Sequence, residues 1–230
     1  LAPHDGADPF LLRIFDVEGT SDCSLAAMDK YGFGALTWES TILALLARGS
    51  LRRVDVLERT IAALERDYLA FRAGWFSRFH ATLAPSLDER AVHAERYVGL
   101  LRSKNPSTLT LAAEAVAALY DANHLASDEF VASLEAVLTA KAKSLVNLGL
   151  GILDRVVARD PGTKTEAIRA LLVVFVSDSA ELQKKAIARL ESWGIPDELR
   201  AEASALAAQI VPTLRDRFAK LFGESAPARP

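Results

Sequence analysis

The segment VSDSAELQKKAIARLESWG, residues 176–194, decides the fold of this chain. Leu182, Ala186 and Leu190 recur every four residues within it, so they lie on one face of an α-helix with a small residue between two large ones. A lysine pair lies at the centre of the segment. Such a segment is either a basic recognition helix or one half of a repeated structural unit.

Two earlier segments carry the same stripe at a nearly constant spacing. The corresponding residues are Leu145, Gly149 and Leu153, then Leu111, Ala115 and Leu119. The preceding helix shifts with the stripe: Ile168, Leu171 and Phe175 correspond to Val131, Leu134 and Leu138 and, in part, to Tyr97 and Leu100. Because both helices of a pair recur together, we interpret the opening segment as the second helix of a repeat.

The periodicity is helical from residue 37 to residue 222, with turn signals between the helices. A single pair cannot bury both of its faces, so pairs must stack. The sequence therefore predicts an all-α fold, a right-handed α-α superhelix of antiparallel pairs, with clear repeats at about 93–126, 127–161 and 162–197. Residues 1–36 are predicted to form an irregular arm that docks a single turn of helix, and residues 223–230 a flexible tail.

The second helix of the last repeat resembles those of HEAT-like and armadillo-like repeat proteins. The resemblance rests on Asp178, Leu182, Lys184, Lys185, Ala186 and Leu190. Residues 73–103 and 142–161 are also similar to an uncharacterised bacterial family of helical-repeat proteins. The resemblance implies a stacked helical fold and brings no catalytic residue with it.

The composition is that of a globular chain, with 230 residues, 50% hydrophobic residues and a net charge of -3. The acidic balance disfavours nucleic acid as a partner. Cys23 is the only cysteine, so an internal disulfide and a cysteine-based zinc site are excluded, and we expect a cytoplasmic location. The most apolar run, residues 170–176, is too short to span a membrane. The chain begins with Leu1, which suggests a processed chain or part of a longer one.

Catalytic motifs are not found in the sequence. The four histidines are His4, His80, His93 and His124, and none has metal-ligand spacing; Asp121 and His124 are assigned a structural or solvent role. Gly149 and Gly151 lie inside a repeat helix, where close packing explains them better than a nucleotide does. We expect a protein that is not an enzyme and has no cofactor or metal.

The densest aromatic cluster lies in residues 67–80. Trp75, Phe79 and His80 are a candidate aromatic anchor for a peptide, with Arg72 and Arg78 at its rim. The alternative, which we favour, is that these side chains are core, because aromatic side chains dominate burial where helices join.

A second candidate is a partner-binding row formed by Lys143, Asn147 and Lys184, in which Ala113 would take the earlier equivalent position. Thr110, Ser144 and Glu181 would lie alongside this row. A plain solvated face explains the same residues, and we favour that interpretation.

Three functions remain open from the sequence. The leading hypothesis is a scaffold that binds a protein or peptide. The second is a DNA-binding HEAT-like module or a DNA glycosylase-like enzyme, for which Trp193, Asp197, Lys184 and Lys185 are the only local set. The third is a spacer within a larger protein.

Overall fold

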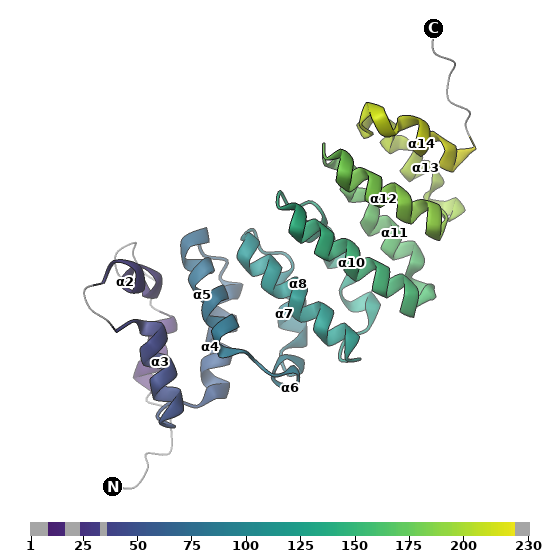
Figure 1. Ribbon diagram of the computed structural model, residues 1–230. Helices are drawn as coiled ribbons and strands as arrows, with labels where there is room; N and C mark the ends of the chain where they lie inside the picture. The colour runs from purple at the N-terminus through teal and green to yellow at the C-terminus, as the bar shows by residue number, and fades with distance from the viewer. Residues whose placement is uncertain (1–8, 17–23, 33–35, 224–230) are drawn as a thin grey trace, which may run out of the picture. The chain divides into compact units, whose positions relative to one another are not determined.

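The computed structural model describes residues 9–16, 24–32 and 36–223, and these residues form helices and no strand (Figure 1). The all-α fold class is therefore confirmed. The chain divides into two compact units, Leu1–Ala112 and Ala113–Pro230, whose boundary falls inside α8 (Pro106–Asp121). The predicted tail lies outside the described residues from residue 224 onward.

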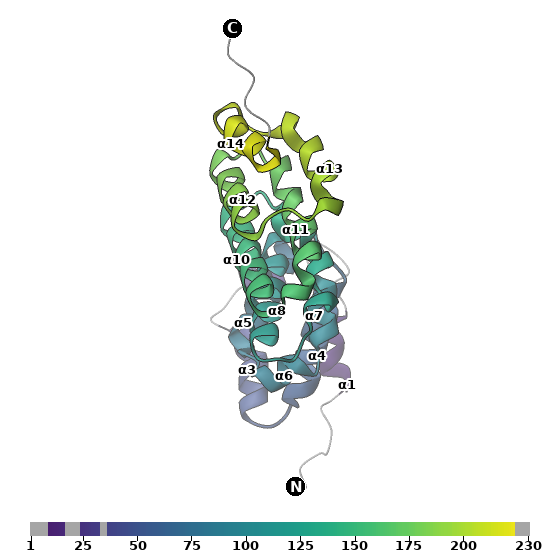
Figure 2. The same cartoon turned by 90° about the vertical axis from the view of Figure 1, so that its right-hand side faces the viewer.

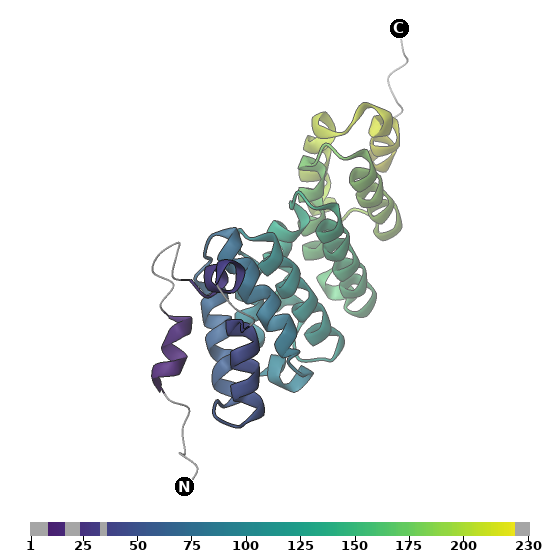
Figure 3. The same ribbon diagram turned by 60° about the vertical axis from the view of Figure 1, so that its left-hand side comes forward.

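Unit 1 contains the first seven α-helices. They are α1 (Pro9–Leu12), α2 (Leu25–Tyr31), α3 (Trp38–Ala47), α4 (Arg53–Glu65), α5 (Ala70–Leu83), α6 (Leu87–Ala91) and α7 (Ala94–Leu100). The 3-10 helix η1 (Arg13–Phe15) continues α1, and both, purple in Figure 3, pack against α4. The segment predicted as an irregular arm thus also contains α2, whose first turn is capped by the hydroxyl of Ser24.

Asp29 of α2 connects three helices of unit 1. Its carboxylate accepts hydrogen bonds from the backbone N–H groups of Trp38 and Glu39, which open α3, and from the indole of Trp75 in α5 at 2.8 Å. The first N–H groups of a helix have no partner within the helix and carry partial positive charge, so a carboxylate is well placed there. This contact positions α2 and α3 on α5.

Unit 2 stacks short helices on long ones. Its elements are η2 (Ser127–Glu129), η3 (Val131–Leu134), α9 (Glu135–Leu138), α10 (Lys143–Arg159), η4 (Pro161–Thr163), α11 (Lys164–Leu172), η5 (Val173–Val176), α12 (Ala180–Trp193), α13 (Asp197–Ala205), η6 (Leu206–Gln209), η7 (Pro212–Leu214), α14 (Arg215–Ala219) and η8 (Lys220–Phe222). Figure 2 shows α10 and α12 in one layer and α11 and α13 in the other.

The stripes read from the sequence are buried. Leu182, Ala186 and Leu190 are each at most 2% exposed. Leu145, Leu153, Ala115 and Leu119 are buried as well, whereas Leu111 is half-buried. The segment 131–138 is one turn of 3-10 helix followed by one turn of α-helix rather than a continuous helix, yet Val131, Leu134 and Leu138 remain buried.

Gly149 lies where α9 presses on α10. A Cβ atom there would come within 2.9 Å of both Leu138 Cδ2 and Val137 Cγ1, whereas a Cβ atom at Gly151 would meet nothing within 4 Å. Valine has a stiff χ1 torsion, so its methyl group cannot easily move aside. Close helix approach therefore explains the glycine at residue 149 and does not explain the one at residue 151.

This contrast predicts that the same substitution has different effects on stability at the two glycines, although they lie only two residues apart in α10. Gly151→Ala should raise the free energy of unfolding by up to about 1 kcal/mol, since alanine favours the helix over glycine. Gly149→Ala should gain less or lose stability, and Gly149→Leu should lose about 1–3 kcal/mol through overpacking. Urea denaturation of the three variants measures these differences. An equal gain for both alanine variants would contradict the close approach at Gly149.

His80 of α5 and Tyr97 of α7 form a buried polar contact. His80 Nε2 and the Tyr97 hydroxyl are 2.7 Å apart, and the two rings meet edge to face. Burial, helped by the charges of Arg90 and His93, lowers the pKa of His80 to about 4. Burial also raises the pKa of Tyr97 to about 12. Both groups are therefore neutral at pH 7.

The low pKa of His80 predicts a loss of stability in mild acid. The unfolded chain takes up a proton below pH 6.5 that the folded chain does not bind until about pH 4, so stability falls as the pH falls through this range. Between pH 7 and pH 5 the loss should be about 2 kcal/mol, measured by urea denaturation. His80→Gln, which keeps a partner for Tyr97 but does not titrate, should remove most of this dependence. The same pH dependence in both proteins would contradict the assignment.

Candidate functional site

The partner-binding row predicted from the sequence falls on α10 and α12. Lys143 is the first residue of α10, and Asn147 lies one turn later. Both lie on the side of α10 that faces α12, because each forms a hydrogen bond with a side chain of that helix. The two helices are neighbours in the same layer of unit 2.

Two residues of α12 connect Lys143 to Asn147. The Glu181 carboxylate accepts from Lys143 Nζ at 3.3 Å and from Lys185 Nζ at 2.9 Å. Lys185 Nζ also donates to the side-chain oxygen of Asn147 at 2.8 Å. We call these four residues, Lys143, Asn147, Glu181 and Lys185, the polar row.

The polar row lies at the surface, and its charges are partly compensated. Lys185, followed by Lys143, lowers the pKa of Glu181 below its ordinary value. Because the Asn147 oxygen accepts from an ammonium group, its amide nitrogen is turned the other way, and among the described residues no acceptor for its two N–H groups is found. The row therefore presents an oriented amide between two lysines.

A second pair continues the contact between α10 and α12 further along both helices. Arg189 donates through Nε and Nη2 to the two carboxylate oxygens of Asp154, with the Nε bond at 2.8 Å. The Arg189 side chain is 19% exposed. This two-pronged geometry fixes the register of α12 on α10.

Lys184 does not take the place predicted for it beside Asn147. It is exposed, and no hydrogen bond or ion pair to it is found in the part of the chain that the structure describes. The neighbouring lysine, Lys185, occupies that place instead. Successive residues of an α-helix are turned by about 100°, so Lys184 and Lys185 point to different sides of α12, and only Lys185 faces α10.

The candidate aromatic anchor is part of the core of unit 1. Trp75, Phe79 and His80 are 2%, 0% and 3% exposed. Trp75 and Phe79 stack with ring centroids 5.1 Å apart, and Phe15 packs on Phe79 at 6.2 Å. These side chains are not at the surface to meet a peptide, so the core interpretation is the one that the geometry supports.

The set considered for a DNA glycosylase is spread over two helices. Trp193 is half-buried at the end of α12, and Asp197 is exposed at the start of α13. Within the described ranges no hydrogen bond joins Trp193, Asp197 and Lys184. Lys185, the fourth member, is engaged by Glu181 and Asn147.

The described residues include neither a metal-binding cluster nor a membrane-spanning helix. The described part of the chain contains no group of three or more His, Cys, Asp or Glu residues that could hold a metal ion. None of its helices is both long and apolar enough to cross a membrane.

Residues 15–144 match the family described as a domain of unknown function, DUF6493. The match covers more than half of the chain, so the chain belongs to this family. No curated protein and no solved structure matches it.

The geometry of the row predicts that two adjacent lysines differ in their effect on stability. Lys184→Glu should change the free energy of unfolding by no more than about 0.5 kcal/mol, as surface substitutions generally do. Lys185→Glu should cause a larger loss, because it places a second negative charge one turn from Glu181 and removes the bond to Asn147. Urea denaturation at low and high salt measures both effects. High salt screens the charges, so it should reduce the difference in stability between the two variants. A larger loss for Lys184→Glu would contradict the position of α12.

Proposed function

We propose that this chain is a non-enzymatic helical-repeat scaffold that binds a protein or peptide partner through the face formed by α10 and α12. The observation that carries the proposal is the polar row, in which Lys185 holds the oxygen of Asn147 and the amide N–H groups have no partner within the described ranges. An oriented amide is a suitable donor for the backbone carbonyl of an extended peptide. The lysines around it favour a partner with acidic side chains.

The finer architecture is part of the same proposal. We infer a right-handed, HEAT-like superhelix of stacked antiparallel pairs over residues 37–222, which would present the second helices of successive repeats along one face. The two layers of unit 2 support this arrangement. Second helices in one layer repeat their surface at regular intervals, as an extended partner requires. We place the scaffold in the cytoplasm, because the single cysteine, Cys23, cannot form an internal disulfide.

A peptide-display library screened against the full chain tests the proposal. Selected peptides should bind the wild-type protein in a fluorescence polarisation assay. Asn147→Ala and Lys143→Glu should each weaken them by about tenfold, the effect of losing one well-placed polar contact. Arg169→Glu is the matched control, because Arg169 is exposed on α11, in the other layer.

Two outcomes would overturn the proposal. One is a set of peptides whose affinity is the same for the wild-type protein and for both row variants. The other is binding of duplex DNA at low salt that weakens steeply as the salt concentration rises and that Lys143→Glu abolishes. This result would identify the polar row as a nucleic-acid-binding site.

A further inference from the structure

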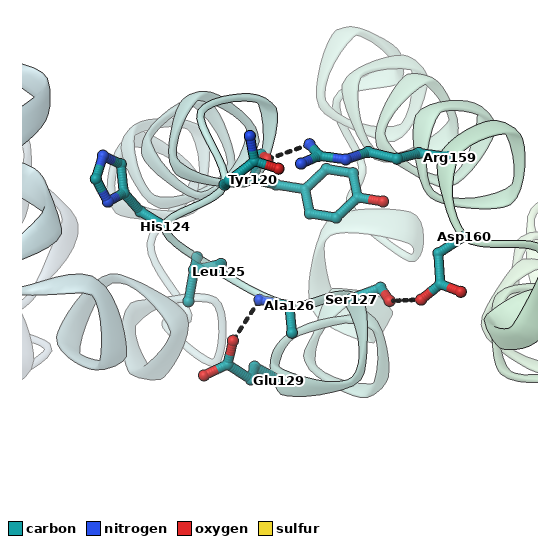
Figure 4. Close-up of a pocket in the computed structure, with 9 residues that line it drawn as sticks. Tyr120, His124, Leu125, Ala126, Ser127, Glu129, Arg159 and Asp160 are labelled. Carbon is teal, nitrogen blue, oxygen red and sulfur yellow. Dashed lines mark hydrogen bonds between the residues drawn. The ribbon is translucent and has the colours of Figure 1, made fainter.

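A pocket of about 420 Å³ lies in unit 2, away from the polar row, where α8 and α10 end (Figure 4). One wall is the end of α8 and the loop that leads into η2, and the other is the end of α10. Its principal residues are Tyr120, His124, Ser127, Glu129, Arg159 and Asp160. The sequence assigned none of them to a binding site.

The loop is shaped by the way α8 stops. Asn123 has a φ of 64°, in the left-handed region that asparagine tolerates better than most residues. The N–H group of His124 then reaches back to the carbonyl of Leu119. This reversal carries the chain across the end of α8 and leaves the pocket open beneath the ring of Tyr120.

The hydroxyl of Tyr120 is buried and has no hydrogen-bond partner among the described residues. The residue is 3% exposed, its ring packs edge to face on Phe130, and the Arg159 guanidinium lies over it at 4.7 Å. Figure 4 shows the hydroxyl pointing along the pocket between Arg159 and Ser127. A buried hydroxyl without a partner is energetically unfavourable. A ligand in the pocket that forms a hydrogen bond with it would remove this cost.

Within the described residues, the side chain of each charged group around this hydroxyl makes one hydrogen bond. Arg159 donates from Nη1 to the carbonyl oxygen of Tyr120. Asp160 accepts from the Ser127 hydroxyl at 2.6 Å, and Glu129 accepts from the N–H group of Ala126. A guanidinium has five donors and a carboxylate about four acceptor sites, so each group keeps capacity for a ligand.

Opposite charges face each other across the pocket. Although Arg159 and Asp160 both come from the end of α10, the Arg159 guanidinium lies on the side of the Tyr120 ring, while the carboxylates of Asp160 and Glu129 lie opposite, beside Ser127 and Ala126 (Figure 4). Burial raises the pKa of Tyr120, an effect that Arg159 reduces, so its hydroxyl is protonated at neutral pH and can donate. The side of the pocket with Arg159 and Tyr120 therefore suits an anionic acceptor, and the side with the two carboxylates suits a cationic donor.

We propose that this pocket binds a small zwitterion, namely the linked ammonium and carboxylate of a free amino acid or of a short peptide. The carboxylate accepts from Arg159 and from the Tyr120 hydroxyl, while the ammonium donates to Asp160, and Glu129 adds negative charge on the same side of the pocket. The side chain of the ligand points to solvent through the open mouth, so selectivity among amino acids is weak. The proposal does not rest on the polar row.

Titration of the ¹⁵N-labelled full chain with leucine tests the proposal by NMR. Leucine should shift the amide signals of residues 120–129 and 159–160 in a saturable manner. N-acetyl-leucine lacks the ammonium and leucinamide lacks the carboxylate, so each should bind about tenfold more weakly, as when one charged contact is lost. Dileucine distinguishes a free amino acid from a short peptide as the ligand. If dileucine binds more tightly than leucine, the pocket is a peptide site; if it binds more weakly, the pocket is an amino-acid site.

Three variants connect the binding to named groups. Tyr120→Phe should weaken leucine by about threefold to tenfold, the effect of one hydrogen bond. It should leave the unfolding midpoint unchanged or raise it, because it removes an unpaired buried hydroxyl. Arg159→Gln should abolish saturable binding. Arg155→Gln is the matched control: Arg155 is an exposed arginine of α10 that pairs with Asp121 and does not line the pocket.

The proposal is overturned if leucine causes no saturable shift at these residues. It is equally overturned if N-acetyl-leucine or leucinamide binds as well as leucine, because a single charge would then suffice. A Tyr120→Phe variant that folds with wild-type stability and binds leucine with unchanged affinity would exclude the role of the hydroxyl.

Discussion

Each long helix of unit 2 has one apolar stripe, and two helices joined by a turn leave part of that apolar surface open to water. Stacking of pairs removes this exposure, and most of the local structure follows from it. Leu145 and Leu153 are buried on α10, as Leu182 and Leu190 are on α12. The two helices of one pair, α9 and α10, also approach closely, which requires the glycine at residue 149.

The same burial of apolar stripes determines which polar groups stay at the surface and which need hydrogen-bond partners inside the unit. Those on the outer side of the helices, such as Glu181 and Lys185, pair across the surface, where each contact contributes little to stability. Gln183 is fully buried and is tolerated because its amide donates to the carbonyl oxygens of Ser177 and Gln209 and accepts from the N–H group of Val211. It joins the loops on either side of the α12–α13 pair. The Tyr120 hydroxyl departs from this pattern, since it is buried and has no partner among the described residues.

The sequence carries information about helices and stripes but little about how neighbouring helices are aligned. Spacing alone places Leu182 on the buried side of its helix, and the structure agrees. Whether Lys184 or Lys185 reaches Asn147 depends on the rotation of α12 against α10, which the Arg189–Asp154 contact sets. That contact joins residues far apart in the sequence, so no local pattern reveals it. The pocket escapes prediction for the same reason, because Tyr120 and Asp160 come together only after two helices have stacked.

The matched family segment ends inside the surface that we assign to binding. Residues 15–144 include Tyr120, Ser127 and Glu129 but stop before Arg159 and Asp160, so one wall of the pocket lies inside the matched segment and the other outside it. The polar row is divided too, since Lys143 falls within the segment and Asn147 does not. The matched segment therefore includes Tyr120 but not Arg159. The charged groups of both surfaces therefore come from both parts of the chain, as the contact between Lys143 and Glu181 shows.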